Sequence, residues 1–146
     1  MARLSEKSLL AVAAIVDIAI HSRGQPVAAK ALAERHNLPP RHLEPVLQAL
    51  VHAGILKGVR GPRGGYELAR ERRRISVAEI ARVAETTGAE NAVHIPVLVE
   101  KVVQPAVASA EQSFEVALSG VSIDELCREA EKLGLVQAMS SADFNI

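Results

Sequence analysis

The chain has 146 residues, of which 49% are hydrophobic and 23% charged, a composition typical of one folded domain of ordinary size. Its 17 basic residues balance its 17 acidic ones, but the two signs are unevenly distributed. Residues 1–74 contain 13 Lys and Arg and 6 Asp and Glu, whereas residues 75–146 contain 4 and 11. This asymmetry predicts a basic working half and an acidic supporting half.

One cysteine, Cys127, limits the chemistry of the chain. A single thiol excludes an internal disulfide framework and any metal site made only of thiolates from one chain, and we expect a reducing, cytoplasmic setting. The apolar run over residues 9–20 contains Asp17 and is shorter than the ~20 residues that cross a bilayer. We therefore interpret this run as a buried helix and expect neither a targeting signal nor a membrane segment.

Hydrophobic periodicity predicts three helices in the first half of the chain, over residues 6–21, 27–35 and 40–54. Ser5 is a residue type that caps helix starts, and Pro40 suits the first turn of the third helix. The second and third helices are separated by a tight turn. Two short helices at this spacing are typical of a helix-turn-helix motif.

A β-hairpin is predicted directly after the third helix. Residues 55–59 and 66–68 form its two strands, and the glycines of residues 60–65 permit the positive φ angles of a turn between them. The turn also carries two arginines. A basic hairpin placed directly after a helix-turn-helix is the arrangement of a winged helix.

The second half of the chain is predicted to be helical. Serines followed three residues later by glutamate predict the starts of helices over residues 77–85 and 123–133. Residues 86–94 are predicted to form an irregular linker. A proline then opens a longer helix over residues 96–118, and Pro105 inside it predicts a kink.

The predicted fold class is therefore mainly α with a small β-hairpin wing. It comprises a winged helix-turn-helix DNA-binding domain over residues 1–85, a linker over 86–95, and a long dimerisation helix with a C-terminal helix over 96–146. The long helix has a continuous apolar stripe, which a second copy of the chain would cover. The stripe residues that we assign to dimerisation are Val99, Val103, Val107, Ala110, Phe114 and Leu118.

The third predicted helix turns a polar face away from its apolar stripe. Side chains on this face are suited to read a major groove, since arginine pairs with guanine, glutamine with adenine, and glutamate with the amino group of cytosine. A solvated surface helix carries similar residues, so both interpretations stay open. The candidate DNA-binding residues of this helix are Arg41, His42, Glu44 and Gln48.

The hairpin turn carries Arg60 and Arg63 on a narrow, glycine-rich tip, which suits insertion into a minor groove or contact with phosphates. A turn with solvated arginines is the alternative. A nucleotide-binding loop is disfavoured, because the segment has neither the Lys-Ser/Thr pair of a P-loop nor the dinucleotide-binding fingerprint. Gly64, Gly65 and Tyr66 are also candidate DNA-binding residues.

Several segments are similar to one family of regulators. They are residues 9–19, 43–47, 54–56, 75–80 and 121–126, and above all Val59-Arg60-Gly61-Pro62-Arg63-Gly64-Gly65-Tyr66. Together they resemble the Rrf2 family of bacterial winged helix-turn-helix regulators over most of the chain. The resemblance implies a homodimeric transcription factor, usually a repressor, that reads a pseudo-palindromic operator in double-stranded DNA. It also implies that the polar face described above belongs to the recognition helix and the two turn arginines to the wing.

The chain departs from the family pattern in two places. Cluster-binding members place three cysteines in the linker, but residues 86–98 contain none, so a three-cysteine iron-sulfur site is excluded. His94 and Cys127 are weak candidate metal ligands, and we interpret both as structural; an atypical cluster that uses Cys127 stays open. The second departure is Pro45, which interrupts the backbone hydrogen bonds of the recognition helix and predicts a bend in its early turns.

The sequence also bears on two other classes of function. An enzyme is disfavoured, because the five histidines lack metal-ligand spacing and no set of catalytic side chains is apparent; His21 and His36 are interpreted as solvated residues. The alternative to a DNA-binding regulator is a winged-helix module or sensor that acts through a partner protein. An unidentified effector that acts through the linker over residues 86–98 is expected to switch operator affinity.

Overall fold

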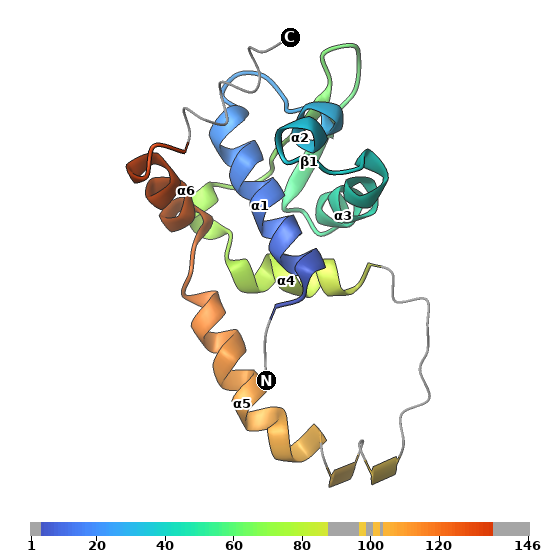
Figure 1. Ribbon diagram of the computed structural model, residues 1–146, viewed down its shortest axis with the longest axis vertical. Helices are drawn as coiled ribbons and strands as arrows, with labels where there is room; N and C mark the ends of the chain where they lie inside the picture. Colours follow the sequence, from blue (N-terminus) through green and yellow to red (C-terminus); the bar gives the residue numbers. More distant parts are fainter. Residues whose placement is uncertain (1–3, 88–96, 99–100, 103, 136–146) are drawn as a thin grey trace.

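The computed structural model describes residues 4–87, 97–98, 101–102 and 104–135. Most of these residues are helical, and one antiparallel hairpin forms the only sheet among them, which confirms the predicted fold class (Figure 1). In chain order the elements are α1 (Glu6–His21), α2 (Ala29–Arg35), α3 (Pro40–His52), β1 (Leu56–Val59), β2 (Gly65–Leu68), the 3-10 helix η1 (Arg72–Arg74), α4 (Val77–Glu85), α5 (Gln104–Ser119) and α6 (Ile123–Lys132).

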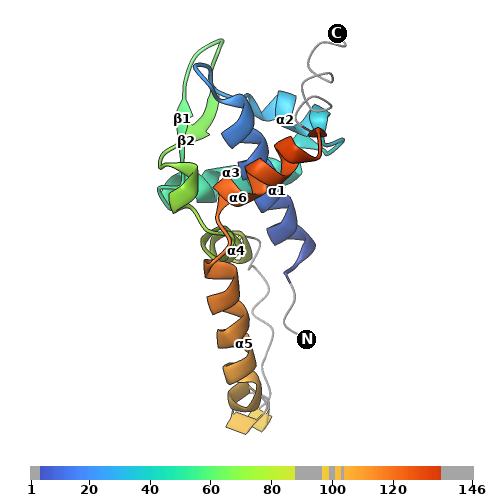
Figure 2. The ribbon, with the colours of Figure 1, turned by 90° about the vertical axis from the view of Figure 1, so that its left-hand side faces the viewer.

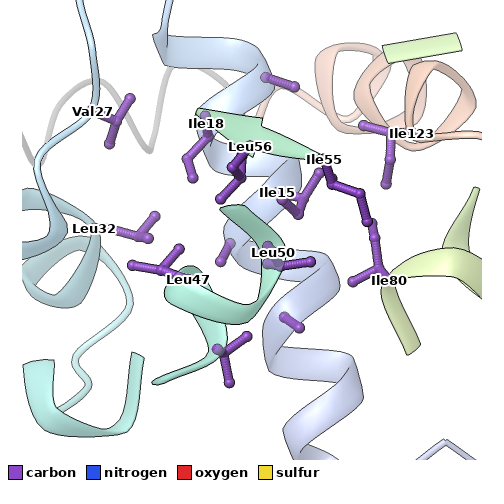
Figure 3. Close-up of a cluster of buried hydrophobic side chains, with 14 of the residues drawn as sticks. Ile15, Ile18, Val27, Leu32, Leu47, Leu50, Ile55, Leu56, Ile80 and Ile123 are labelled. Atoms are coloured by element: carbon purple, nitrogen blue, oxygen red, sulfur yellow. The ribbon is translucent and has the colours of Figure 1, made fainter. Parts of the chain in front are cut away.

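Helix α1 lies at the centre of the molecule, with α2 and α3 on one side of it and α6 on the other (Figure 1). Its Ile15 and Ile18 are 0% exposed, and the buried side chains of the other elements gather around them (Figure 3). Those side chains include Leu32, Leu47, Leu50, Ile55, Leu56, Ile80 and Ile123. One core therefore holds α3 and the hairpin in a defined relation to α1.

Three of the helices begin at serine N-caps. The side-chain oxygen of Ser5 accepts a hydrogen bond from the backbone N–H of Ser8, and Ser76 accepts one from Glu79 in the same way. Ser122 also caps α6 by this arrangement. Because such caps act within three residues, the predicted starts of these helices are confirmed.

The hairpin is joined to the segment before α2. Val27 N–H donates to the carbonyl oxygen of Tyr66 (N···O 2.9 Å), and Tyr66 N–H donates to that of Val27 (2.8 Å). The second helix was expected over residues 27–35, but it begins at Ala29. Val27 is extended instead of helical because its backbone groups pair with the hairpin. This bridge fixes the base of the wing against the helix-turn-helix.

Helix α6 packs back onto α1. Its Ile123 and Cys127 are both 0% exposed and belong to the same core as α1. The backbone also joins α6 to the start of α4, because Ile123 N–H donates to the carbonyl oxygen of Ile75 (2.9 Å) and Val77 N–H to that of Val121 (3.0 Å). The expected linker over residues 86–95, between the DNA-binding domain and the C-terminal helices, stays a prediction. Helix α6 was expected on the far side of that linker, but it shares its core with the winged helix.

Helix α5 projects away from the other helices (Figure 2). An ion pair between Arg82 on α4 and Glu115 on α5 (Nε···Oε1 3.2 Å) lies where the two helices meet. Pro105 lies in the first turn of α5, where a backbone N–H has no hydrogen-bond partner within the helix. The proline therefore removes no hydrogen bond from α5. The predicted kink stays a prediction. The expected start of this helix at Pro96 lies outside the described residues.

The predicted dimerisation stripe is only partly described. Val99 and Val103 lie outside the described residues, as does the side chain of Val107. Of the others, Ala110 is exposed, whereas Phe114 and Leu118 are half-buried.

Candidate nucleic-acid interface

Helix α3 separates its apolar and polar residues onto opposite faces. Apolar positions spaced three or four residues apart turn into the core, as Leu43 and Leu47 do with 1% and 0% exposure. The intervening polar side chains therefore face solvent, as the sequence predicted. The exposed residues are Arg41, His42, Glu44, Pro45 and Gln48.

Pro45 lies within this exposed face, and α3 continues as one helix through it to His52. The proline lacks the N–H that would bond to the carbonyl oxygen of Arg41, and both residues are exposed, so water can reach that oxygen. The buried side of α3 holds the helix together across this position. The predicted bend in its early turns stays a prediction.

The hairpin turn requires glycine for steric reasons. A Cβ atom at position 64 would lie 2.2 Å from the carbonyl oxygen of Val59, and Gly61 has a φ of +113°. The N–H of Gly64 closes the turn by donating to the carbonyl oxygen of Gly61 (2.9 Å). The turn projects beyond the helices (Figures 1 and 2). Arg60 and Arg63 on this turn are exposed. Gly64 thus shapes the wing, whether or not it contacts DNA.

A groove of about 370 Å³ lies between α3 and the hairpin. Gln48 and Val51 of α3 line one side of it, and Val59, Arg60 and Tyr66 of the hairpin region line the other. The structure thus brings together four of the candidate residues, Gln48 from α3 and Arg60, Gly65 and Tyr66 from the hairpin. The polar face of α3 and the wing form one continuous surface.

The arginines near this surface differ from those that follow the wing. Arg41, Arg60 and Arg63 form no ion pair or hydrogen bond with any residue that the structure describes. In contrast, Arg70 pairs with Glu79, and Arg72 pairs with Asp124. Arg73 and Arg74 both lie near Glu71. Arg41, Arg60 and Arg63 are therefore available to meet an external anion.

Of the two weak candidate metal ligands, only Cys127 lies among the described residues. Cys127 is 0% exposed, and burial raises the pKa of its thiol, while the positive charge of Arg72 opposes this shift. His94 lies outside the described residues. Among the residues that are described, no three histidine, cysteine or acidic side chains are placed to bind a metal ion.

Two histidines that were expected to be solvated instead contact a buried carboxylate. His36 Nε2 lies 2.7 Å from Asp17 Oδ2, and His21 Nδ1 lies 3.2 Å from Asp17 Oδ1. Asp17 itself is 0% exposed. The charge at position 17 within an apolar run was visible in the sequence, but its partners are brought to it by the fold.

A family model described as an iron-dependent transcriptional regulator, Rrf2, matches residues 4–129. The chain belongs to the Rrf2 family. This confirms the resemblance inferred from the wing and from the segments around it.

Curated relatives match a little more than half of this chain. The HTH-type transcriptional regulator IscR of Xenorhabdus nematophila is 41% identical over 78 residues, which are 53% of this chain and 48% of that protein. IscR of Vibrio cholerae is 39% identical over 88 residues, 60% of this chain and 51% of that one. The chain spans about half the length of these curated relatives.

Solved structures match more of the chain. IscR of T. potens has a TM-score of 0.70 and 32% identity, and the match covers 90% of both chains. CymR, the global cysteine regulator of B. subtilis, has a TM-score of 0.69 at 24% identity over 88% of this chain and 98% of its own, which shows the shared fold. The curated relatives are named as HTH-type transcriptional regulators. No helix in the described part of this Rrf2 chain is long and apolar enough to cross a membrane.

Proposed function

We propose that this Rrf2 protein is a homodimeric, sequence-specific DNA-binding regulator that represses transcription from a pseudo-palindromic operator. Its relatives are named as HTH-type transcriptional regulators. The observation that carries the proposal is the continuous surface made by α3 and the wing. Its arginines are unpaired within the described residues, and Gln48 and Arg60 line one groove.

Helix α3 enters the major groove in this proposal. An α-helix fits that groove, and the exposed face offers Arg41, Glu44 and Gln48, whose side chains can each recognise a different base. His42 lies beside them on the same face. The buried side of the helix packs into the core, so these side chains project together from the opposite face.

The wing contacts the sugar-phosphate backbone or the adjacent minor groove. Arg60 and Arg63 stand on a turn whose backbone is constrained by Gly61 and Gly64, so their positions relative to α3 are restricted. Arginine binds phosphates well and is attracted to narrow minor grooves. The wing therefore adds affinity and orients the recognition helix.

Dimerisation through the long helix brings two such surfaces together. Of the stripe side chains that the structure describes, Ala110 is exposed and Phe114 and Leu118 are half-buried in one copy of the chain. A second copy related by two-fold symmetry would cover them and place two recognition helices on successive turns of the duplex. The operator would then have matching two-fold symmetry.

The regulatory signal is not carried by a three-cysteine cluster. The family description names iron, but the only cysteine of this chain is Cys127, which is buried in the core. We propose that an unidentified effector or partner acts through residues 86–98 and the long helix. It would change the separation or tilt of the two winged helices and so the operator affinity.

The proposal is tested by selecting genomic DNA fragments with the purified, anaerobically prepared full chain. Selected fragments are then footprinted at two salt concentrations. We expect a protected site with two-fold symmetry and an affinity that falls steeply with salt, because several arginines displace counterions. Failure to enrich any sequence, together with salt-independent behaviour, would instead support a winged-helix module that acts through a partner protein.

A further inference from the structure

A buried carboxylate on α1 holds the end of α2. Asp17 is 0% exposed, and its two carboxylate oxygens accept two hydrogen bonds from Arg35, with Nη2···Oδ1 at 2.7 Å and Nε···Oδ2 at 2.9 Å. His36 Nε2 lies 2.7 Å from Oδ2. The side chain of Arg35 is itself only 5% exposed. The two-pronged contact is strongly directional, because the guanidinium and the carboxylate must be coplanar to make both bonds.

The charge state of this cluster favours a fixed geometry. Burial raises the pKa of Asp17, but hydrogen bonds from His36 and Arg35 and the positive charge of Arg35 outweigh it and hold the pKa below its usual range. Asp17 is therefore ionised at neutral pH. A buried ion pair adds little net stability compared with apolar residues of similar size, but it penalises every arrangement in which the partners separate.

Helix α2 has a small apolar anchor, and the backbone bridge between Val27 and Tyr66 acts before its first residue, at the end away from Arg35. The helix has seven residues, of which only Leu32 and Ala33 are buried. Such a small apolar anchor permits sliding and rotation, because hydrophobic contact is not directional. Arg35 is the last residue of α2, so the Asp17 contact acts at the end nearest the recognition helix.

The chain between this contact and α3 is short and constrained. His36 is the C-cap of α2, Asn37 has a φ of 53°, and Leu38 N–H donates to the carbonyl oxygen of Ala33 (2.9 Å). Helix α3 begins at Pro40. A shift at the end of α2 is therefore passed directly to the first turn of α3, where the candidate base-reading residues begin.

We propose that Asp17 is a positioning residue for DNA recognition, which sets the angle of α3 by holding Arg35 and His36. This inference rests on the proposed DNA-binding function. It predicts that loss of the contact lowers the affinity for operator DNA more than the affinity for random DNA. The ratio of the two affinities therefore falls. The wing arginines that meet phosphates stay in place, but the base-reading side chains of α3 lose their register.

The test compares operator and random-duplex affinities by fluorescence anisotropy for the full-length protein and three variants. Asp17→Asn removes the charge, and Arg35→Lys keeps the charge pair but loses the two-pronged geometry. Ile123→Val is the control, because it perturbs the same core from α6 without touching α2. Each measurement is made at a temperature where circular dichroism shows that the variant is folded.

We expect Asp17→Asn and Arg35→Lys to lower the ratio of operator to random-DNA affinity by about tenfold or more. Ile123→Val should leave this ratio within about twofold of the wild-type value. If Asp17→Asn does not fold, Arg35→Lys decides the matter. A ratio for the folded variants that matches the control would overturn the positioning role. A wild-type protein with no preferred DNA sequence would overturn the proposed function itself.

Discussion

Val27 and Gly65 approach so closely that a Cβ atom at position 65 would lie 2.3 Å from the carbonyl oxygen of Val27. This approach accompanies the paired backbone hydrogen bonds between Val27 and Tyr66. Only glycine leaves the space for it. The lack of a side chain at position 65 therefore sets the distance between the wing and the segment that leads into α2.

Replacing Gly65 with alanine is expected to destabilise the protein by about 2 kcal/mol or more, because the new methyl group collides with backbone rather than with a movable side chain. Urea unfolding measures this effect. Gly58→Ala is the matched control in the same hairpin, since a Cβ at Gly58 would meet nothing within 4 Å. Equal losses of stability for the two variants would show that the close approach to Val27 is not the cause of the destabilisation at position 65.

The wing arginines are expected to contribute directly to DNA affinity. Arg60→Ala and Arg63→Ala should each weaken operator binding by about 1 to 3 kcal/mol, and loss of a phosphate contact should also reduce the salt dependence. Arg128→Ala on α6 removes the same charge from a different element and is the control. Anisotropy titrations at several salt concentrations measure both effects. Unchanged affinity for both wing variants would show that these arginines do not contact DNA.

Gln48 is expected to affect sequence preference more than general affinity. If its amide reads a base edge, Gln48→Ala should weaken binding to the preferred base by about 1 to 3 kcal/mol and relax selection at one position in each half-site. Selection from randomised duplexes, carried out with wild type and variant, measures this directly. An unchanged preference at every position would indicate that Gln48 only lines the groove.

The stripe on α5 is expected to hold the dimer together. Ala110 is exposed on this stripe, so Ala110→Glu would bury a charge between two copies and should shift the protein toward monomer. Gln112→Glu adds the same charge on the opposite side of the helix and should leave the dimer intact. Sedimentation velocity distinguishes the two results. Dimers of undiminished stability in the Ala110 variant would place the interface elsewhere.

Acid should destabilise the protein partly through Asp17. The pKa of Asp17 in the folded protein lies below its ordinary value of 3.8, so the unfolded chain binds more protons in the interval between the two. The stabilisation is present above the ordinary value and is lost as the pH falls through the folded-state pKa. Urea unfolding across this range should show a shallower loss for Asp17→Asn than for wild type. Equal losses of stability for the two proteins as the pH falls would show that Asp17 is not a source of the acid sensitivity.

Much of the fold could be predicted from local patterns. The bounds of α1 and α4 follow from helical periodicity and from the caps Ser5 and Ser76, which act within a few residues. The exposed face of α3 could also be predicted, because it is the complement of an apolar stripe. In both cases the information lies within one or two helical turns.

Contacts between distant segments could not be predicted in this way. Val27 pairs with Tyr66, and Ile123 joins the core around α1, but neither pairing has a signal in the local sequence. Asp17 was recognisable as a charge in an apolar run, yet many cations could have been its partner. The groove shared by Gln48 and Arg60 likewise depends on where the hairpin packs.

DNA cleavage directed from single sites on the protein tests the central claim most directly. The only native cysteine is fully buried, so cysteines introduced by Pro45→Cys on α3, Pro62→Cys on the wing or Gln112→Cys on α5 can be labelled selectively with an iron chelate. On the selected operator, the α3 and wing probes should each cut in two clusters related by two-fold symmetry, displaced from one another along the duplex. The α5 probe should not cut. Cleavage that is uniform along the DNA, or strongest from α5, would contradict recognition by α3 and the wing.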